Sequence, residues 1–192
     1  GLALLARDYP EAADHLGEVY HAAPDADFRA FVDDLGDYAP HARRVTAAVN
    51  LGDSALRLAQ VINRASRAGR PDIRELDAAT SERLLAASAT GEIELVQVHP
   101  DRMPELSATS HTFWYDHPWA SNDVLLTLLF HLPASARGLD SAVAPSGATY
   151  WTFPEDYPPR QPAVLDAVRA QPDAQPCPPA DPAALASRAA AS

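Results

Sequence analysis

The chain has 192 residues, 47% of them hydrophobic, and a formal charge of −11, which predicts one folded domain with or without a tail. All 15 basic residues are arginine. The absence of lysine excludes Schiff-base catalysis, pyridoxal-phosphate attachment, the P-loop and the protein-kinase reaction, and the acidic balance opposes general binding to nucleic acid.

The first half of the chain carries mainly helical signals. A first helix is predicted to begin at an acidic cap that is followed by Pro10 and Glu11, and its apolar face extends to Tyr20. A second helix is predicted to end at Gly36, because its apolar residues fall at i, i+3, i+4 and i+7, namely Phe28, Phe31, Val32 and Leu35. An apolar stripe over 40–62 predicts two helices or one kinked helix, and a short helix follows at 78–87.

The second half mixes strand and helix signals. Residues 92–98 alternate between polar and apolar side chains, as a half-buried strand does, and short strands are also predicted at 111–115 and 148–153. Ser121, Asn122 and Asp123 offer caps for a helix that Pro133 stops. One more helix is predicted at 163–170.

The predicted fold class is therefore mainly α, a helical bundle with a small β element of two or three short strands in the C-terminal half. The region 1–90 is expected to be helical, and 91–160 to carry the strands and pack on it within the same domain. The region 161–192 is rich in proline and alanine, and we expect a largely disordered tail there.

The expected location is the cytoplasm, without a membrane anchor. The longest apolar run, 124–132, is shorter than the roughly 18 residues that a membrane-spanning helix needs, and the first residues lack the basic leader of a signal peptide. The only cysteine, Cys177, excludes intrachain disulfides and cysteine-ligated zinc or iron–sulfur centres, which favours a reducing compartment.

One group of side chains could bind a metal ion. Imidazole and carboxylate ligands suit zinc or non-heme iron, and the candidates are His99, His111, Asp116 and His117. Their spacing matches no helical ligand motif such as H-E-x-x-H, and His99 and His117 each precede a proline, so a structural role as turn residues is the simpler interpretation. A small metal-dependent enzyme is kept as an alternative function.

Positive charge is concentrated in one segment of this acidic chain. Arg57 and Arg64 are seven residues apart and would share a helix face, with Arg67 one turn further on and Arg70 and Arg74 beyond it. Guanidinium groups bind carboxylates in a bidentate manner, so this stripe could bind an acidic peptide or protein surface. A solvated helix face paired with nearby acids is an equally good interpretation.

Several segments between 24 and 119 follow one another as they do in a known family. These are Phe28-Arg29-Ala30-Phe31-Val32, Tyr38-Ala39-Pro40, Leu76-Asp77-Ala78-Ala79, the strand ending in Val96-Gln97-Val98-His99-Pro100, and Trp114 after a spacer. In this order the chain resembles the helical partner proteins of multinuclear non-heme iron oxidases in ribosomal-peptide biosynthesis, of the methanobactin type. The resemblance covers about half of the chain and stops after Trp119.

This resemblance implies a non-catalytic, protein-binding subunit with no cofactor of its own. It would dock an iron-dependent oxidase, a precursor peptide or both in natural-product biosynthesis. Arg57, Arg64, Arg67, Trp114 and Trp119 are the candidate partner-binding residues, since arginine and tryptophan are frequent in interface hot spots. A buried aromatic position is the plainer role for Trp114. A helical regulatory or scaffold protein is the third alternative.

Overall fold

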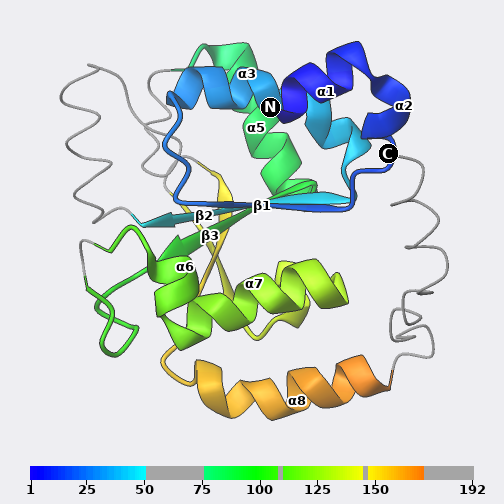
Figure 1. Cartoon of the computed structure of the whole chain (residues 1–192). Helices are drawn as coiled ribbons and strands as arrows, with labels where there is room; N and C mark the ends of the chain where they lie inside the picture. Colours follow the sequence, from blue (N-terminus) through cyan, green and yellow to red (C-terminus); the bar gives the residue numbers. More distant parts are fainter. Residues whose placement is uncertain (51–75, 108–109, 145–146, 171–192) are drawn as a thin grey trace, which may run out of the picture.

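The protein folds around a five-stranded sheet with helices on both faces (Figure 1). The structure is a computed structural model that describes residues 1–50, 76–107, 110–144 and 147–170. The strand order is β1-β2-β3-β5-β4, in which only the β4–β5 pair is antiparallel. The strands are β1 (Glu18–Ala22), β2 (Arg44–Asn50), β3 (Ile93–Val98), β4 (Asp140–Val143) and β5 (Thr149–Thr152).

The helices form one layer on each side of the sheet (Figure 1). The first layer holds α1 (Leu2–Asp8), α2 (Pro10–Ala13), α3 (Phe28–Tyr38) and α5 (Ala78–Thr90). The second holds α6 (Phe113–Asp116), α7 (Pro118–Phe130) and α8 (Tyr157–Arg169). Short 3₁₀ turns lie at Ala39–His41 and Ala134–Ala136. None of the helices in the described part of the chain is both long and apolar enough to cross a membrane.

The prediction of a mainly helical bundle is wrong, because the protein is an α/β fold whose sheet takes strands from both halves of the chain. Much of the error lies at β2, where the apolar residues were interpreted as a helical stripe. Six of its seven residues are buried, since helices cover both faces of the sheet. A strand buried on both faces is apolar without alternation, so its sequence does not show the period of two.

Other elements differ from the sequence-based expectations in part. Residues 18–20, expected at the end of a helix, begin the edge strand β1, and the strand expected at 111–115 is instead the short helix α6. The helices α7 and α8 begin earlier than expected, at Pro118 and Tyr157, and α8 extends into the region predicted to be a tail. The prediction for 171–192 lies outside the described residues.

Local signals were correct at α3 and α5. The spacing of its apolar residues predicted α3, whose N-cap is Asp27, and the Asp27 carboxylate accepts a hydrogen bond from the Ala30 amide at 3.0 Å. Asp77 caps α5 in the same way, and Gly91 ends that helix with a φ of 79°. The strands β3 and β5 also lie within the predicted ranges 92–98 and 148–153.

Candidate functional site

A buried network of charged side chains fastens α7 to the sheet. The guanidinium of Arg137 is fully buried and contacts Glu94 of β3 at 2.8 Å and Asp123 of α7 at 3.3 Å. It also donates to the hydroxyl of Thr127, one turn further along α7. Buried charges are tolerated only when they are paired in this manner.

The network extends to β1 and β2. Glu94 accepts further hydrogen bonds from the hydroxyl of Thr46 at 3.1 Å and from the amide of Ala134 at 2.7 Å. Arg44, at the start of β2, lies 3.5 Å from Glu94 and 3.8 Å from Glu18 at the start of β1. Three strands and α7 thus meet in one set of ion pairs.

Burial sets the protonation of this network. It raises the pKa of the Asp123 carboxyl, while the neighbouring Arg137 acts in the opposite direction. It also raises the pKa of Tyr20 well above 10, and the charge of Asp123 adds to this effect. Tyr20 therefore remains a hydrogen-bond donor to Asp123. Because Arg137 and Asp123 are closed to solvent, we assign the network a structural role.

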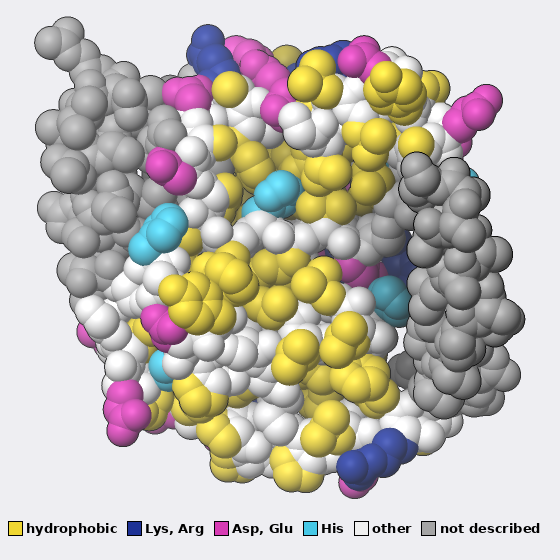
Figure 2. Space-filling view, in the orientation of Figure 1, with side chains coloured by type: hydrophobic (Ala, Val, Ile, Leu, Met, Phe, Trp, Pro, Cys, Tyr) yellow, Lys and Arg dark blue, Asp and Glu magenta, His cyan; other side chains and the backbone are white. Residues whose placement is uncertain are grey.

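The outer side of the second helical layer is apolar and exposed. The helix α7 carries no charged side chain after Asp123, although one side of it faces solvent. A helix that is apolar all round is usually buried on all sides. We define the α6–α7 face as Trp114, Tyr115, Leu125, Leu128, Leu129 and Phe130, which are 39–64% exposed. Figure 2 shows hydrophobic side chains gathered over these helices.

A groove of about 580 Å³ joins this face to the edge of the sheet. Its walls come from the carboxyl end of β1, from α6 and from α7, and include Tyr20, Ala22, Trp114, Tyr115, Val124 and Leu128. In open α/β sheets, ligands and partners bind outside the carboxyl ends of the strands. The groove and the α6–α7 face together form the candidate functional site.

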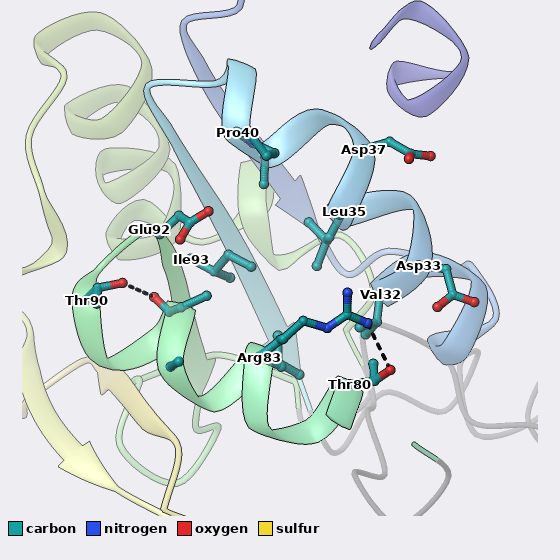
Figure 3. A pocket seen from close by; sticks show the side chains of 15 residues that line it. Val32, Asp33, Leu35, Asp37, Pro40, Thr80, Arg83, Thr90, Glu92 and Ile93 are labelled. Atoms are coloured by element: carbon teal, nitrogen blue, oxygen red, sulfur yellow. Dashed lines mark hydrogen bonds between the residues drawn. The ribbon is translucent and has the colours of Figure 1, made fainter. Parts of the chain in front are cut away.

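A second groove, of about 610 Å³, lies between α3 and α5 on the opposite face of the sheet (Figure 3). Its apolar lining includes Val32, Leu35 and Ile93. Arg83 extends from α5 towards α3 and donates a hydrogen bond to the hydroxyl of Thr80 at 3.2 Å. Three carboxylates accompany this single guanidinium in the lining, namely Asp33, Asp37 and Glu92.

The structure does not bring three of the four candidate metal ligands together. His117 accepts a hydrogen bond at Nδ1 from the Trp119 amide, so its Nε2 carries the proton and donates to the carbonyl of Pro104 at 2.9 Å. Asp116 accepts from the Thr112 hydroxyl, and His111 lines the groove. Across the described ranges, no three His, Cys, Asp or Glu side chains are placed to hold a metal ion.

The candidate partner-binding residues have separate locations. Trp114 is 40% exposed and lines the groove. Trp119 is partly buried against the core and lies 5.6 Å from Tyr157, measured between ring centroids. Arg57, Arg64 and Arg67 lie outside the described residues.

Sequence analysis missed most of the exposed apolar residues, although a signal for them was present. The segment from Val124 to Phe130 contains a single polar residue, Thr127, so α7 has no polar face to turn to solvent. In a surface helix, such a segment indicates a contact with another molecule. Glu94 and Arg137 carried no comparable signal, because they are 43 residues apart and meet only through the fold.

The fold and the site together define a three-layer α/β protein with an exposed apolar helical face beside an edge strand. Comparisons with models of protein families, with curated proteins and with solved structures each give no match. The functional argument therefore depends on the site itself.

Proposed function

We propose that this chain is a non-catalytic, protein-binding subunit and that it associates through the α6–α7 face. The observation that carries the proposal is the exposure of four large apolar side chains on α7, with Leu129 64% exposed. Isolated apolar residues on a surface need no explanation, but a contiguous group of them is typical of an interaction site.

The composition of the face supports this function. Trp114 and Tyr115 are packed edge to face on α6, with ring centroids 4.7 Å apart. Tryptophan and tyrosine are enriched in interface hot spots, because they bury a large area at a small cost in conformational entropy. The buried network beneath α7 supports the same role, since it fixes the helix to the sheet and presents the outer residues on a rigid element.

The partner that the resemblance implies, an iron-dependent oxidase acting on a precursor peptide, remains a prediction for the assembly. In this proposal the metal and the oxidation belong to the partner. The present chain contributes the binding surface.

Copurification tests the proposal with variants that change one exposed leucine. Leu129→Arg places a charge in the α6–α7 face, and Leu4→Arg places the same charge on α1, where Leu4 is 53% exposed. Tagged protein is purified from cells that also express an untagged copy of the chain and the proteins encoded beside it. We expect Leu129→Arg to lose the bound protein and Leu4→Arg to retain it. Equal recovery with both variants would contradict the proposal.

A further inference from the structure

The edge strand β1 has backbone groups that no strand in the described part of the chain pairs with. It pairs with β2 alone. The carbonyl of Gly17 accepts from the Arg43 amide, and the Ala23 amide donates to the carbonyl of Ala48, so these odd-numbered positions face β2. Backbone groups alternate in direction along a strand, which turns those of Glu18, Tyr20 and Ala22 towards the open edge.

The open edge and the α6–α7 face form one continuous surface. Tyr20 reaches Asp123 of α7 with its phenol, and the groove brings Ala22 next to Val124 and Leu128. The helix α7 therefore runs beside β1 (Figure 1). A polypeptide that paired with the edge would also cover the apolar helix.

We infer that the molecule covering this surface is a second copy of the same chain, which makes the protein a two-fold dimer. The inference rests on the proposed function, because it names the partner of the α6–α7 face. In this dimer the two β1 strands pair antiparallel, with Tyr20 opposite its own copy, and the sheet continues across the two-fold axis. The two α7 helices then pack against each other through Leu125 and Leu129.

Self-association requires a surface that is complementary to itself. An apolar helix meets this requirement, and so does a strand edge, which offers both amide donors and carbonyl acceptors. Charge supports the same conclusion. Two copies that each carry a formal charge of −11 repel one another, which favours a contact with few acidic groups. Residues 124–130 contain none, and Asp25 is the acidic residue in the lining of the groove.

The area of the surface agrees with a stable dimer. The six side chains of the α6–α7 face together expose the equivalent of about three whole side chains, or roughly 600 Å² at about 200 Å² for each. A standard interface buries about 800 Å² on each partner. The backbone edge of β1 and the walls of the groove supply the remainder.

A dimer of this form leaves the groove between α3 and α5 uncovered, because that groove lies on the opposite face of the sheet. A different protein could therefore bind each copy there while the dimer remains intact.

The first test is the mass of the full chain in solution, measured by light scattering and sedimentation velocity from about 1 to 100 μM. We expect twice the chain mass of 20.6 kDa. Leu129→Arg should weaken the dimer at least about 30-fold, the effect of losing one interface hot spot. Leu4→Arg should leave it unchanged, and circular dichroism checks that both variants are folded.

The second test addresses the strand edge directly. Ala22→Pro removes an amide that points away from β2, a position where an edge strand tolerates proline. Ala22→Ser keeps the amide and is the matched control. We expect proline, but not serine, to weaken the dimer, while the folded monomer persists.

A wild-type chain that is monomeric at 100 μM overturns the inference, as does a dimer that survives both Leu129→Arg and Ala22→Pro. The dimer and the proposed function can fail separately. If the wild type is monomeric but Leu129→Arg still loses a copurifying protein, the α6–α7 face binds a different partner. If Leu129→Arg changes no association of either kind, both ideas are wrong.

Discussion

Tyr20 donates a hydrogen bond from its phenol to Oδ2 of Asp123 over 3.1 Å, across 103 residues of sequence. Tyr20 lies on the edge strand, and Asp123 lies in α7 and pairs with Arg137. This contact therefore connects the open edge of the sheet to the buried charges that hold the apolar helix in place. It gives the proposed association surface a fixed geometry before any partner binds.

The stability of the fold should fall at alkaline pH partly through Tyr20. Its pKa is raised in the folded protein and returns to about 10 on unfolding. The folded state therefore holds this proton more tightly, so the stabilisation is complete below pH 10 and is lost as pH rises further. The loss is about 1.4 kcal/mol per pH unit for one such group.

Tyr20→Phe removes this titration. Its free energy of unfolding should be lower than wild type at pH 8 by roughly 1–2 kcal/mol, because Asp123 loses a hydrogen bond. Between pH 10 and 11 the free energy of unfolding should fall by about 1 kcal/mol less in the variant than in the wild type. Tyr9→Phe, at a side chain that is 67% exposed, is the control. Urea unfolding at each pH measures the free energy of unfolding of the wild type and both variants. If it falls with pH in the same way in all three, Tyr20 does not contribute to the loss of stability at alkaline pH.

Removing the guanidinium of Arg137 should destabilise the fold strongly. Arg137→Ala removes the cation paired with the buried Asp123 and leaves Glu94 only the Arg44 guanidinium at 3.5 Å, and breaking a buried pair typically costs about 3–5 kcal/mol. Arg160→Ala is the matched control, because Arg160 pairs with Asp140 and Asp156 at the surface, where ion pairs contribute about 0–1 kcal/mol. Urea unfolding followed by circular dichroism measures both.

A variant at Glu94 keeps this prediction testable if Arg137→Ala does not fold. Glu94→Gln preserves the shape of the side chain and removes one charge of the network. We expect Glu94→Gln to lower the free energy of unfolding by roughly 1–3 kcal/mol, which is more than Arg160→Ala should lower it. Equal stability of the Glu94 and Arg160 variants would show that the buried pairs contribute no more than surface pairs.

The sequence predicted the elements whose determinants are local. Apolar spacing predicted α3 and Asp77 indicated α5, and both signals lie within a few residues of the helix that they predict. It failed at β1 and β2 because their pairing partners are distant. Val45 lies beside Ile93 in the sheet, 48 residues further along, and no local pattern encodes that contact.

The candidate site was predicted only in part for the same reason. Trp114 was selected for its residue type and does lie on the exposed face, whereas Leu129 was not selected as a site residue. A stripe of leucines does not reveal which of its sides will meet the sheet. That choice depends on Asp123 and Thr127 meeting Arg137, a contact between separate segments.

His117 should affect stability and not metal content. Its ring caps the start of α7 and joins that helix to the carbonyl of Pro104. His117→Ala removes both hydrogen bonds, and we expect a loss of about 1–2 kcal/mol by urea unfolding. Replacement of the exposed His15 by alanine is the control, with an expected change within about 0.5 kcal/mol.

Elemental analysis of untagged protein completes this test. Iron or zinc at one equivalent in the wild type, lost in His117→Ala and retained in His15→Ala, would support the metal-dependent alternative. A loss of stability without bound metal would support the structural role of His117.

Two glycines with similar backbone angles should respond differently to alanine. Gly91 has a φ of 79° with open space around it, so Gly91→Ala meets only the strain of the left-handed conformation, about 1–2 kcal/mol. Gly138 has a φ of 82°, and a Cβ there would lie 2.9 Å from Nε2 of Gln161. The second substitution must therefore also displace a side chain.

The displaced amide is not free to move without cost. Gln161 donates to the carbonyl of Arg137 at 3.3 Å and accepts from Asn122 at 2.9 Å, so its shift loosens α8 beside the buried network. We expect Gly138→Ala to lower the free energy of unfolding by roughly 1 kcal/mol more than Gly91→Ala does, because about one hydrogen bond is weakened in addition. Gln161→Ala combined with Gly138→Ala separates the two causes. If the contact is responsible, the double variant should lose less than the two single losses added together, because Gln161 is no longer there to be displaced.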